Sequence, residues 1–274
     1  MDIKFDLVKK LTKPLPKAKG ITLRSLRTSE DGLSASAILM ADSYAQIRQD
    51  VENYRMLTGL PLSARSKGRS LELTSECGGG SALVLMDFLK EIPFENEDVN
   101  DFIEFFNKKI GFNIHGWMIG AGLKDEISGD LIWNTGIIDV NEERGSLTIN
   151  VRYPVTGNAE EVYDGIAPHL DEYDVGVVKG EHKEGIYIPA EDPLVETLME
   201  IYQKHTGDTE TPPIITGGGT YARAMKHGVA YGIKFPGEEA TEHQKNEYID
   251  LENMMKAAAI YAEAIVRLCS DEDE

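Results

Sequence analysis

The sequence has little cysteine, comparatively few basic residues and no long apolar run. Its two cysteines, Cys77 and Cys269, lie far apart and form no CxxC or CxxH motif. This excludes a disulfide framework and a cysteine zinc site. Because 47 acidic residues outnumber 28 basic residues, the net charge of −19 would repel a nucleic acid or an anionic membrane. The charge favours a neutral or cationic small molecule, or another protein, as the partner.

The chain also lacks the signals that direct a protein to a membrane or out of the cell. No segment approaches the roughly 18 apolar residues of a membrane span, and the start "MDIKFDLVKK" has no apolar signal-peptide core. We therefore expect a cytoplasmic protein. Walker, GxGxxG and GxSxG motifs are absent, as is basic and aromatic interleaving for nucleic acid.

The pattern of the first two thirds of the chain predicts an α+β domain. Strands at 20–27 and 33–41, a helix capped by Asp42, a strand at 70–76 and a helix at 82–92 follow the order of a ferredoxin-like unit. Further elements are expected at 96–112 (helix), 130–140 and 145–155 (antiparallel strands), 158–170 (helix) and 173–180 (strand). This predicts a connecting segment over 1–19 and an antiparallel-sheet domain over 20–184.

The remaining residues, 185–274, change to alternation of strand and helix. A helix begins at Pro193, strands are expected at 212–216 and 229–235, and a helix follows at 251–268. This order is typical of α/β domains, but two strands are too few for a parallel sheet covered on both faces. The pattern therefore predicts a partial α/β domain.

Candidate chemistry gathers in "TGGGTYAR" and in the polar loop that follows it. The glycine turn before Arg223 could present N–H groups to an anion, or it could simply be a tight turn that needs positive φ. Arg223 could bind a carboxylate or form a surface ion pair. His243 could bind a metal or be exposed. The other histidines fit no ligand spacing and are expected to be structural or exposed: His115, His169, His182, His205 and His227.

The segment "GGGTYARAMKHGVAYGIKFPGEEATEHQKNEYIDLENMMKAAAIYAEAIVRL" closely resembles the C-terminal segment of PepV-type dipeptidases, which are co-catalytic zinc metallopeptidases. "DVNDFIEFFNKKIGFNIHG", "GSLTINVRYPV" and "YIPAEDPLVETLMEIYQKHTGD" resemble the lid domain of the same family and its return into the catalytic domain. "FDLVKKL" resembles the stretch that follows the last N-terminal zinc ligand. The resemblance implies a ferredoxin-like lid, zinc as the cofactor and a dipeptide as the substrate.

The resemblance also implies roles for individual residues. His243 matches the family's final zinc ligand, and Arg152 matches a lid arginine that holds substrate. Gly218, Gly219 and Arg223 match the turn that receives the dipeptide's C-terminal carboxylate.

Three departures from the family pattern bear on activity. The HxD motif, the Glu-Glu pair with the general base and a further Asp ligand are missing. The lid's Asn-containing loop reads "RTSEDGLSAS", and the loop that carries its oxyanion histidine reads "TSECGGGSALVLMDFL". One histidine cannot hold two zinc ions. We therefore expect a truncated or pared-down dipeptidase that is inactive alone and binds no zinc stably.

Two non-catalytic alternatives remain. The lid could form a homodimer through an edge strand of its sheet. The turn at 217–223 could instead bind a carboxylate without catalysis.

Overall fold

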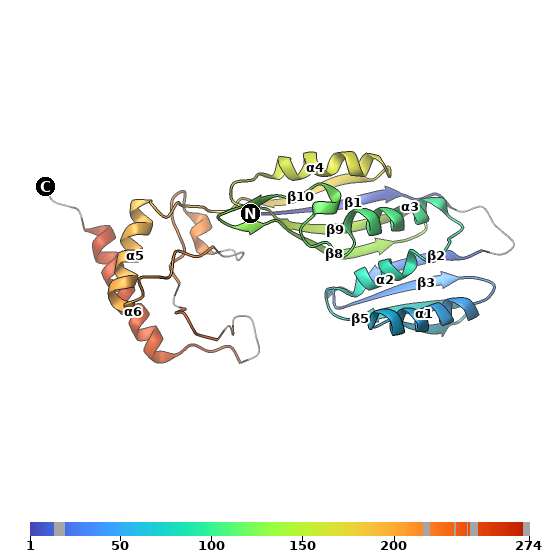
Figure 1. Cartoon of the computed structure of the whole chain (residues 1–274), viewed down its shortest axis with the longest axis horizontal. Coiled ribbons are helices and arrows are strands. Elements are labelled where there is room, and N and C mark those ends of the chain that lie inside the picture. The colour runs from blue at the N-terminus through green and yellow to red at the C-terminus, as the bar shows by residue number, and fades with distance from the viewer. Residues whose placement is uncertain (14–19, 216–219, 233, 240, 242–245, 271–274) are drawn as a thin grey trace. The chain divides into compact units, whose positions relative to one another are not determined.

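The computed structural model divides the chain into two compact units, Met1–Glu184 and Gly185–Glu274 (Figure 1). It describes all residues except 14–19, 216–219, 233, 240, 242–245 and 271–274.

The first unit is built on an eight-stranded sheet in which every neighbouring pair is antiparallel. Its strand order is β10-β1-β9-β8-β2-β3-β5-β4. The strands are β1 (Asp2–Lys10), β2 (Thr22–Thr28), β3 (Ser34–Met40), β4 (Ser63–Lys67), β5 (Ser70–Glu76), β8 (Ile132–Val140), β9 (Arg144–Arg152) and β10 (Gly176–Lys183). A separate small hairpin pairs β6 (Lys124–Asp125) with β7 (Gly129–Asp130). The prediction of an antiparallel sheet is confirmed.

Alternation of apolar and polar residues places one face of each long strand in the core. In β1, Ile3, Phe5 and Leu7 are buried, whereas the residues between them are exposed or half-buried. β1 lies between β9 and β10, so the prediction of a connecting segment over 1–19 is wrong for this stretch. The alternation was already visible in "DIKFDLV" and identifies a strand.

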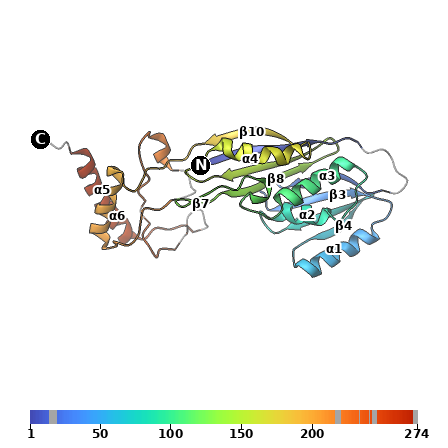
Figure 2. The same cartoon turned by 45° about the horizontal axis from the view of Figure 1, so that its top comes forward.

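Helices cover the buried face of the sheet (Figure 2). They are α1 (Ala45–Thr58), α2 (Ser81–Leu89), α3 (Glu97–Phe105) and α4 (Ala159–Asp171), with a π turn at Phe106–Ile110 and a 3-10 turn, η2, at Trp117–Ile119. The apolar face predicted for the third helix is confirmed, because Val99, Phe102, Ile103, Phe106 and Ile110 are all buried.

Two of these helices, α3 and α4, are capped by the side chain of the asparagine that precedes them, whereas α1 and α2 have no side-chain cap. The Asn96 side chain accepts from the backbone N–H groups of Asp98 and Val99, and Asn158 forms a capping box with Glu161. The predicted Asp42 cap is wrong. Helix α1 begins at Ala45 behind Tyr44, which makes no side-chain cap bond, so Asp42 lies too far upstream to act.

The sheet has two halves that differ in chain order. β10-β1-β9-β8 is formed by the succession β1-α3-β8-β9-α4-β10, and the segment from β2 to α2 is inserted between β1 and α3 to form the other half. The two halves join where β2 pairs with β8 at Leu26↔Val140 and Arg27↔Asp139. The inserted half therefore extends the sheet without interrupting the first half.

The second unit contains α5 (Pro193–Thr206), a 3-10 turn, η3 (Tyr221–Ala224), and α6 (Leu251–Cys269). Its core cluster consists of Leu198, Ile201, Ile260 and Ala264. Pro193 stands in the first turn of α5 as predicted, and Asp192 caps the helix.

The strands predicted at 212–216 and 229–235 are corrected, since none of their described residues is in a strand. A strand requires a hydrogen-bonding neighbour, and the described residues of these two segments do not pair with each other. The second segment is instead held by tyrosines. The Tyr231 hydroxyl donates to the Leu198 carbonyl at 2.8 Å, and the Tyr261 hydroxyl donates to the Tyr231 carbonyl at 2.9 Å.

Candidate functional site

Arg152 is the last residue of β9, on the half of the sheet formed by β10, β1 and β9. It stands opposite Asp2 of β1, and its Nε lies 3.4 Å from Asp2 Oδ1. About half of the Arg152 side chain is exposed (51%). An ion pair this exposed contributes at most about 1 kcal/mol to stability. The guanidinium therefore remains accessible to a dissolved carboxylate.

Two side chains beside Arg152 were not predicted as site residues. Tyr153 is buried, and its hydroxyl lies 2.7 Å from Nε2 of His182 on β10. Burial raises the pKa of Tyr153, and the charges of Glu184 and Asp2 add to this effect. The hydroxyl consequently stays protonated at neutral pH. We call Asp2, Arg152, Tyr153 and His182 the Arg152 corner.

The Arg152 corner offers one accessible guanidinium, beside a tyrosine that holds its proton. Sequence reasoning treated His182 as a scattered histidine. The pairing of the strands is the signal that could have found His182. Ile3 of β1 is paired with His182 of β10 on one side and with Val151 of β9, the residue before Arg152, on the other.

In the second unit, Arg223 lies in η3, behind Thr220. The Thr220 side chain accepts from the Ala222 N–H at 3.3 Å and so caps this turn. Arg223 is exposed. Gly218, Gly219 and His243 lie outside the described residues, so their predicted roles stay predictions. Arg152 and Arg223 belong to different units, and each is placed within its own unit.

His227 links the end of this turn region to the start of α5. Its Nε2 lies 2.9 Å from Asp192 Oδ2, while Asp192 Oδ1 accepts from the Leu194 N–H at 3.0 Å. The hydrogen bond with His227, followed by that from Leu194, lowers the pKa of Asp192. The contact serves a structural role, as expected for this histidine, because Asp192 is already the α5 cap.

The connection from β5 to α2 is a closed turn. The buried Ser81 hydroxyl accepts from the Cys77 N–H at 2.9 Å and lies 2.8 Å from the carbonyls of Leu33 and Gly78. Gly78 adopts a positive φ of 73°, which favours glycine. This is the stretch in which the resemblance places an oxyanion histidine, and Cys77–Ser81 contains none.

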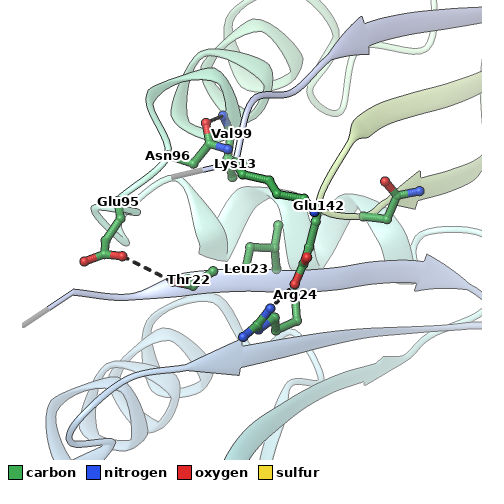
Figure 3. Close-up of a pocket in the computed structure, with 9 residues that line it drawn as sticks. Lys13, Thr22, Leu23, Arg24, Glu95, Asn96, Val99 and Glu142 are labelled. Carbon is green, nitrogen blue, oxygen red and sulfur yellow. Dashed lines mark hydrogen bonds and ion pairs between the residues drawn. The ribbon is translucent and has the colours of Figure 1, made fainter. Parts of the chain in front are cut away.

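A depression of about 240 Å³ in the first unit carries none of the predicted site residues (Figure 3). Within it, Arg24 pairs with Glu142, and Thr22 Oγ1 lies 3.5 Å from Glu95 Oε2. It is lined by Lys13, Thr22, Leu23, Arg24, Glu95, Asn96, Val99, Asn141 and Glu142. Nothing in this lining connects it with the Arg152 corner.

Across the described part of the chain, no group of three or more His, Cys, Asp or Glu side chains could hold a metal ion. Over the same residues, no helix is both long enough and apolar enough to span a membrane.

Comparison with known proteins identifies the family. A family model described as "Peptidase family M20/M25/M40" matches residues 76–267. The chain belongs to this peptidase family. It is 33% identical over 247 residues to a candidate dipeptidase of Staphylococcus epidermidis, covering 86% of this chain and 52% of that protein. A candidate dipeptidase of Staphylococcus aureus strain USA300 is 32% identical over 246 residues, with the same two coverages.

The chain thus spans about half the length of the curated relatives that it matches. Among solved structures, it is similar to the aminoacylhistidine dipeptidase of Vibrio alginolyticus, with a TM-score of 0.40 and 13% identity. That similarity covers 76% of this chain and 49% of the Vibrio protein.

Proposed function

We propose that this chain forms the lid domain and the C-terminal part of the catalytic domain of a PepV-type, zinc-dependent dipeptidase. The match of residues 76–267 to the peptidase family carries the proposal. The names of the staphylococcal relatives support a dipeptide as the substrate class. In this proposal the lid is the first unit and the catalytic part is 185–274.

The chain order of the first unit supports a ferredoxin-like lid. The succession β1-α3-β8-β9-α4-β10 is the β-α-β-β-α-β order of such a unit. It includes β1, so the proposed lid begins near residue 2 rather than at residue 20. In this proposal Arg152, at the end of β9 in the lid, binds the substrate. Gly218, Gly219 and Arg223, which belong to the catalytic part, receive its C-terminal carboxylate.

The described residues do not fit a zinc pair. His243 is the proposed family ligand, but the described part of the chain offers no ligand cluster to join it. A zinc site needs at least three protein ligands. We therefore derive no catalytic step, and we propose that the chain alone neither holds zinc stably nor hydrolyses dipeptides. The closed Cys77–Ser81 turn supports the same conclusion, because it lacks the oxyanion histidine.

The alternative of a homodimer formed through a sheet edge is less well supported. The edge strand β10 carries Lys179 and Lys183, and the edge strand β4 carries Arg65 and Lys67. Charged side chains of this kind are used by natural proteins to prevent edge-to-edge pairing. A cytoplasmic location remains a prediction from the sequence.

The experiment is hydrolysis of a dipeptide panel by the purified chain with added zinc. We expect no release of amino acids above the blank and, by elemental analysis, less than one zinc ion per chain, because at least three ligands are needed. Zinc-dependent hydrolysis that His243→Ala abolishes, and that the control His115→Ala in the first unit leaves unchanged, would contradict the proposal.

A further inference from the structure

Strand β4 is the outer strand of the inserted half of the sheet. It pairs with β5 along one side, over Ser63–Lys67, and no strand among the described residues lies on its other side. Arg48 of α1 shows which backbone groups face that open side, because its Nη1 donates to the Ala64 carbonyl at 2.9 Å. Alternate residues of an antiparallel strand direct both their N–H and their C=O to the same side. Ala64 and Ser66 therefore present these groups to the open edge.

The open edge can still bind another strand. Within the described residues, only Arg48 makes hydrogen bonds there, through Nη1 to the Ala64 carbonyl and through Nη2 to the Ser66 hydroxyl at 2.8 Å. The Ala64 carbonyl keeps a second lone pair, and the N–H groups of Ala64 and Ser66 remain open. An unpaired row of this kind is a template for an extended peptide, which adds to the sheet as a further strand.

Basic side chains flank this edge on both faces of the sheet. Arg65 lies opposite Glu72 in register and Lys67 lies opposite Ser70, and these two residues of β5 alternate with buried leucines. Arg65 and Lys67 therefore project from the face that the helices leave open. Arg48 approaches the edge from the other face, where α1 lies beside β4 (Figure 2).

The charge of this region is opposite to that of the chain as a whole. Residues 45–70 contain five basic and two acidic residues, whereas the whole chain contains 28 basic and 47 acidic residues. The side chains of Arg65 and Arg69 are exposed and have no partner in the described part of the chain. Lys67 Nζ lies 2.6 Å from Glu72 Oε1, but the lysine is 62% exposed, so this pair is weak. The edge thus presents positive charge that the described residues do not neutralise.

These charges determine which kind of strand the edge accepts. A second copy paired at β4 would bring the basic side chains of both copies together, which is unfavourable. An acidic strand would instead place its carboxylates beside Arg65 and Lys67, and cross-strand pairs of opposite charge are stabilising. A nucleic acid lacks the peptide groups that continue the ladder, and the net charge of −19 repels it.

We propose that β4 is a docking edge for an extended acidic segment of another protein, which adds to the sheet beyond β4. The backbone of this segment pairs with Ala64 and Ser66, and its carboxylates lie beside Arg65 and Lys67. The interaction goes beyond the proposed dipeptidase function, because four strands separate β4 from β9, which carries Arg152.

The test is fluorescence anisotropy of labelled peptides, blocked at both ends, titrated with the full chain at low ionic strength. The probe is an eight-residue peptide of alternating threonine and glutamate. A peptide of alternating threonine and lysine reverses its charge. A third peptide keeps every glutamate but has proline in place of every second threonine, so it lacks backbone N–H groups. An eight-nucleotide oligothymidylate is the polyanion control.

The edge variant is Arg65→Gln with Lys67→Gln. Its matched control is Lys4→Gln with Lys10→Gln, which makes the same change on the same face of β1, an interior strand. Ala64→Pro removes an N–H group at the open edge and leaves every charge in place. Circular dichroism checks that each variant folds. Should Ala64→Pro fail to fold, the proline-containing peptide tests the same point.

We expect the acidic peptide to bind the unaltered chain and the lysine control equally. The edge variant should bind it about fivefold more weakly or worse, because two cross-strand charge pairs are lost. Ala64→Pro and the proline-containing peptide should each weaken binding by about tenfold or more, because the backbone ladder is interrupted. The lysine peptide and the oligothymidylate should not bind.

Four results would overturn the proposal. The first is no binding of the acidic peptide, and the second is equal binding by the edge variant. The third is equal binding of the proline-containing peptide or of the oligothymidylate, which would show attraction of any polyanion without strand addition. The fourth, by light scattering, is a dimer of the chain alone that Ala64→Pro dissociates, which would assign the edge to a second copy.

Discussion

At the residue scale, the side chains that organise the first unit are single polar groups with several partners. Asp125, the last residue of β6, accepts from the N–H of Ile127 at 3.0 Å and from both the N–H and the hydroxyl of Thr156 at 3.0 Å. It also accepts from Ser128. This one carboxylate therefore ties the β6–β7 hairpin to the residues that follow β9.

Replacing Asp125 should make the first unit less stable and less sensitive to acid. Burial would raise the pKa of Asp125, but the hydrogen bonds from Ser128 and Thr156 outweigh it and lower the pKa to about 2. Because this folded-state pKa lies below the usual value of about 3.9, the stabilisation is complete above about pH 4 and is lost as the pH falls toward 2. We expect Asp125→Ala to lower the free energy of unfolding by about 1 to 2 kcal/mol at pH 7.

The measurement is urea unfolding between pH 2 and pH 7, with Glu126→Ala as the control. Glu126 is the exposed neighbour of Asp125. An acid dependence that Asp125→Ala leaves as steep as in the unaltered chain would contradict the assignment.

At the element scale, the closed turn between β5 and α2 holds the start of a core helix. Ser81→Ala would leave the N–H of Cys77 and the carbonyl of Leu33 without their side-chain partner. Since Ser81 is fully buried, the expected loss is about 1 to 3 kcal/mol in the free energy of unfolding. Chemical denaturation checks this, and exposed Ser43→Ala is the control. If Ser81→Ala and Ser43→Ala have the same free energy of unfolding, the hydrogen bonds of the Ser81 hydroxyl do not contribute to stability.

The elements that could be predicted from the sequence are those whose signal is local. The buried stripe of α3 follows from helical spacing alone, and the antiparallel pair β8 and β9 follows from alternation around a polar turn. The strands expected at 212–216 and 229–235 were wrong because a strand exists only with a neighbour, and local sequence does not show whether one is present.

The candidate site was predictable only in part, for the same reason. Arg152 was found by resemblance, and the structure places it at the exposed end of β9. Its neighbours come from strands that are distant in sequence. Asp2 is paired with Arg152 across β1 and β9, and His182 reaches Tyr153 from β10. Sheet register, which the sequence pattern left open, determines these contacts.

At the scale of the whole molecule, the two units have separate cores of unequal size. Every residue of the large core cluster lies in the first unit. Among its described residues, the second unit has a cluster of four buried residues, Leu198, Ile201, Ile260 and Ala264. Because stability grows with the apolar surface that is buried, the second unit should be the less stable of the two.

Denaturant should therefore unfold the chain in two steps, with the second unit first. Both tryptophans, Trp117 and Trp133, lie in the first unit, so tryptophan fluorescence reports that unit alone, whereas far-ultraviolet circular dichroism reports the helices of both. We expect circular dichroism to show an early transition that fluorescence does not. Ile201→Ala should move only the early transition and Leu147→Ala only the late one, each cavity costing about 2 to 5 kcal/mol. A single coincident transition in both signals would mean that the units unfold together.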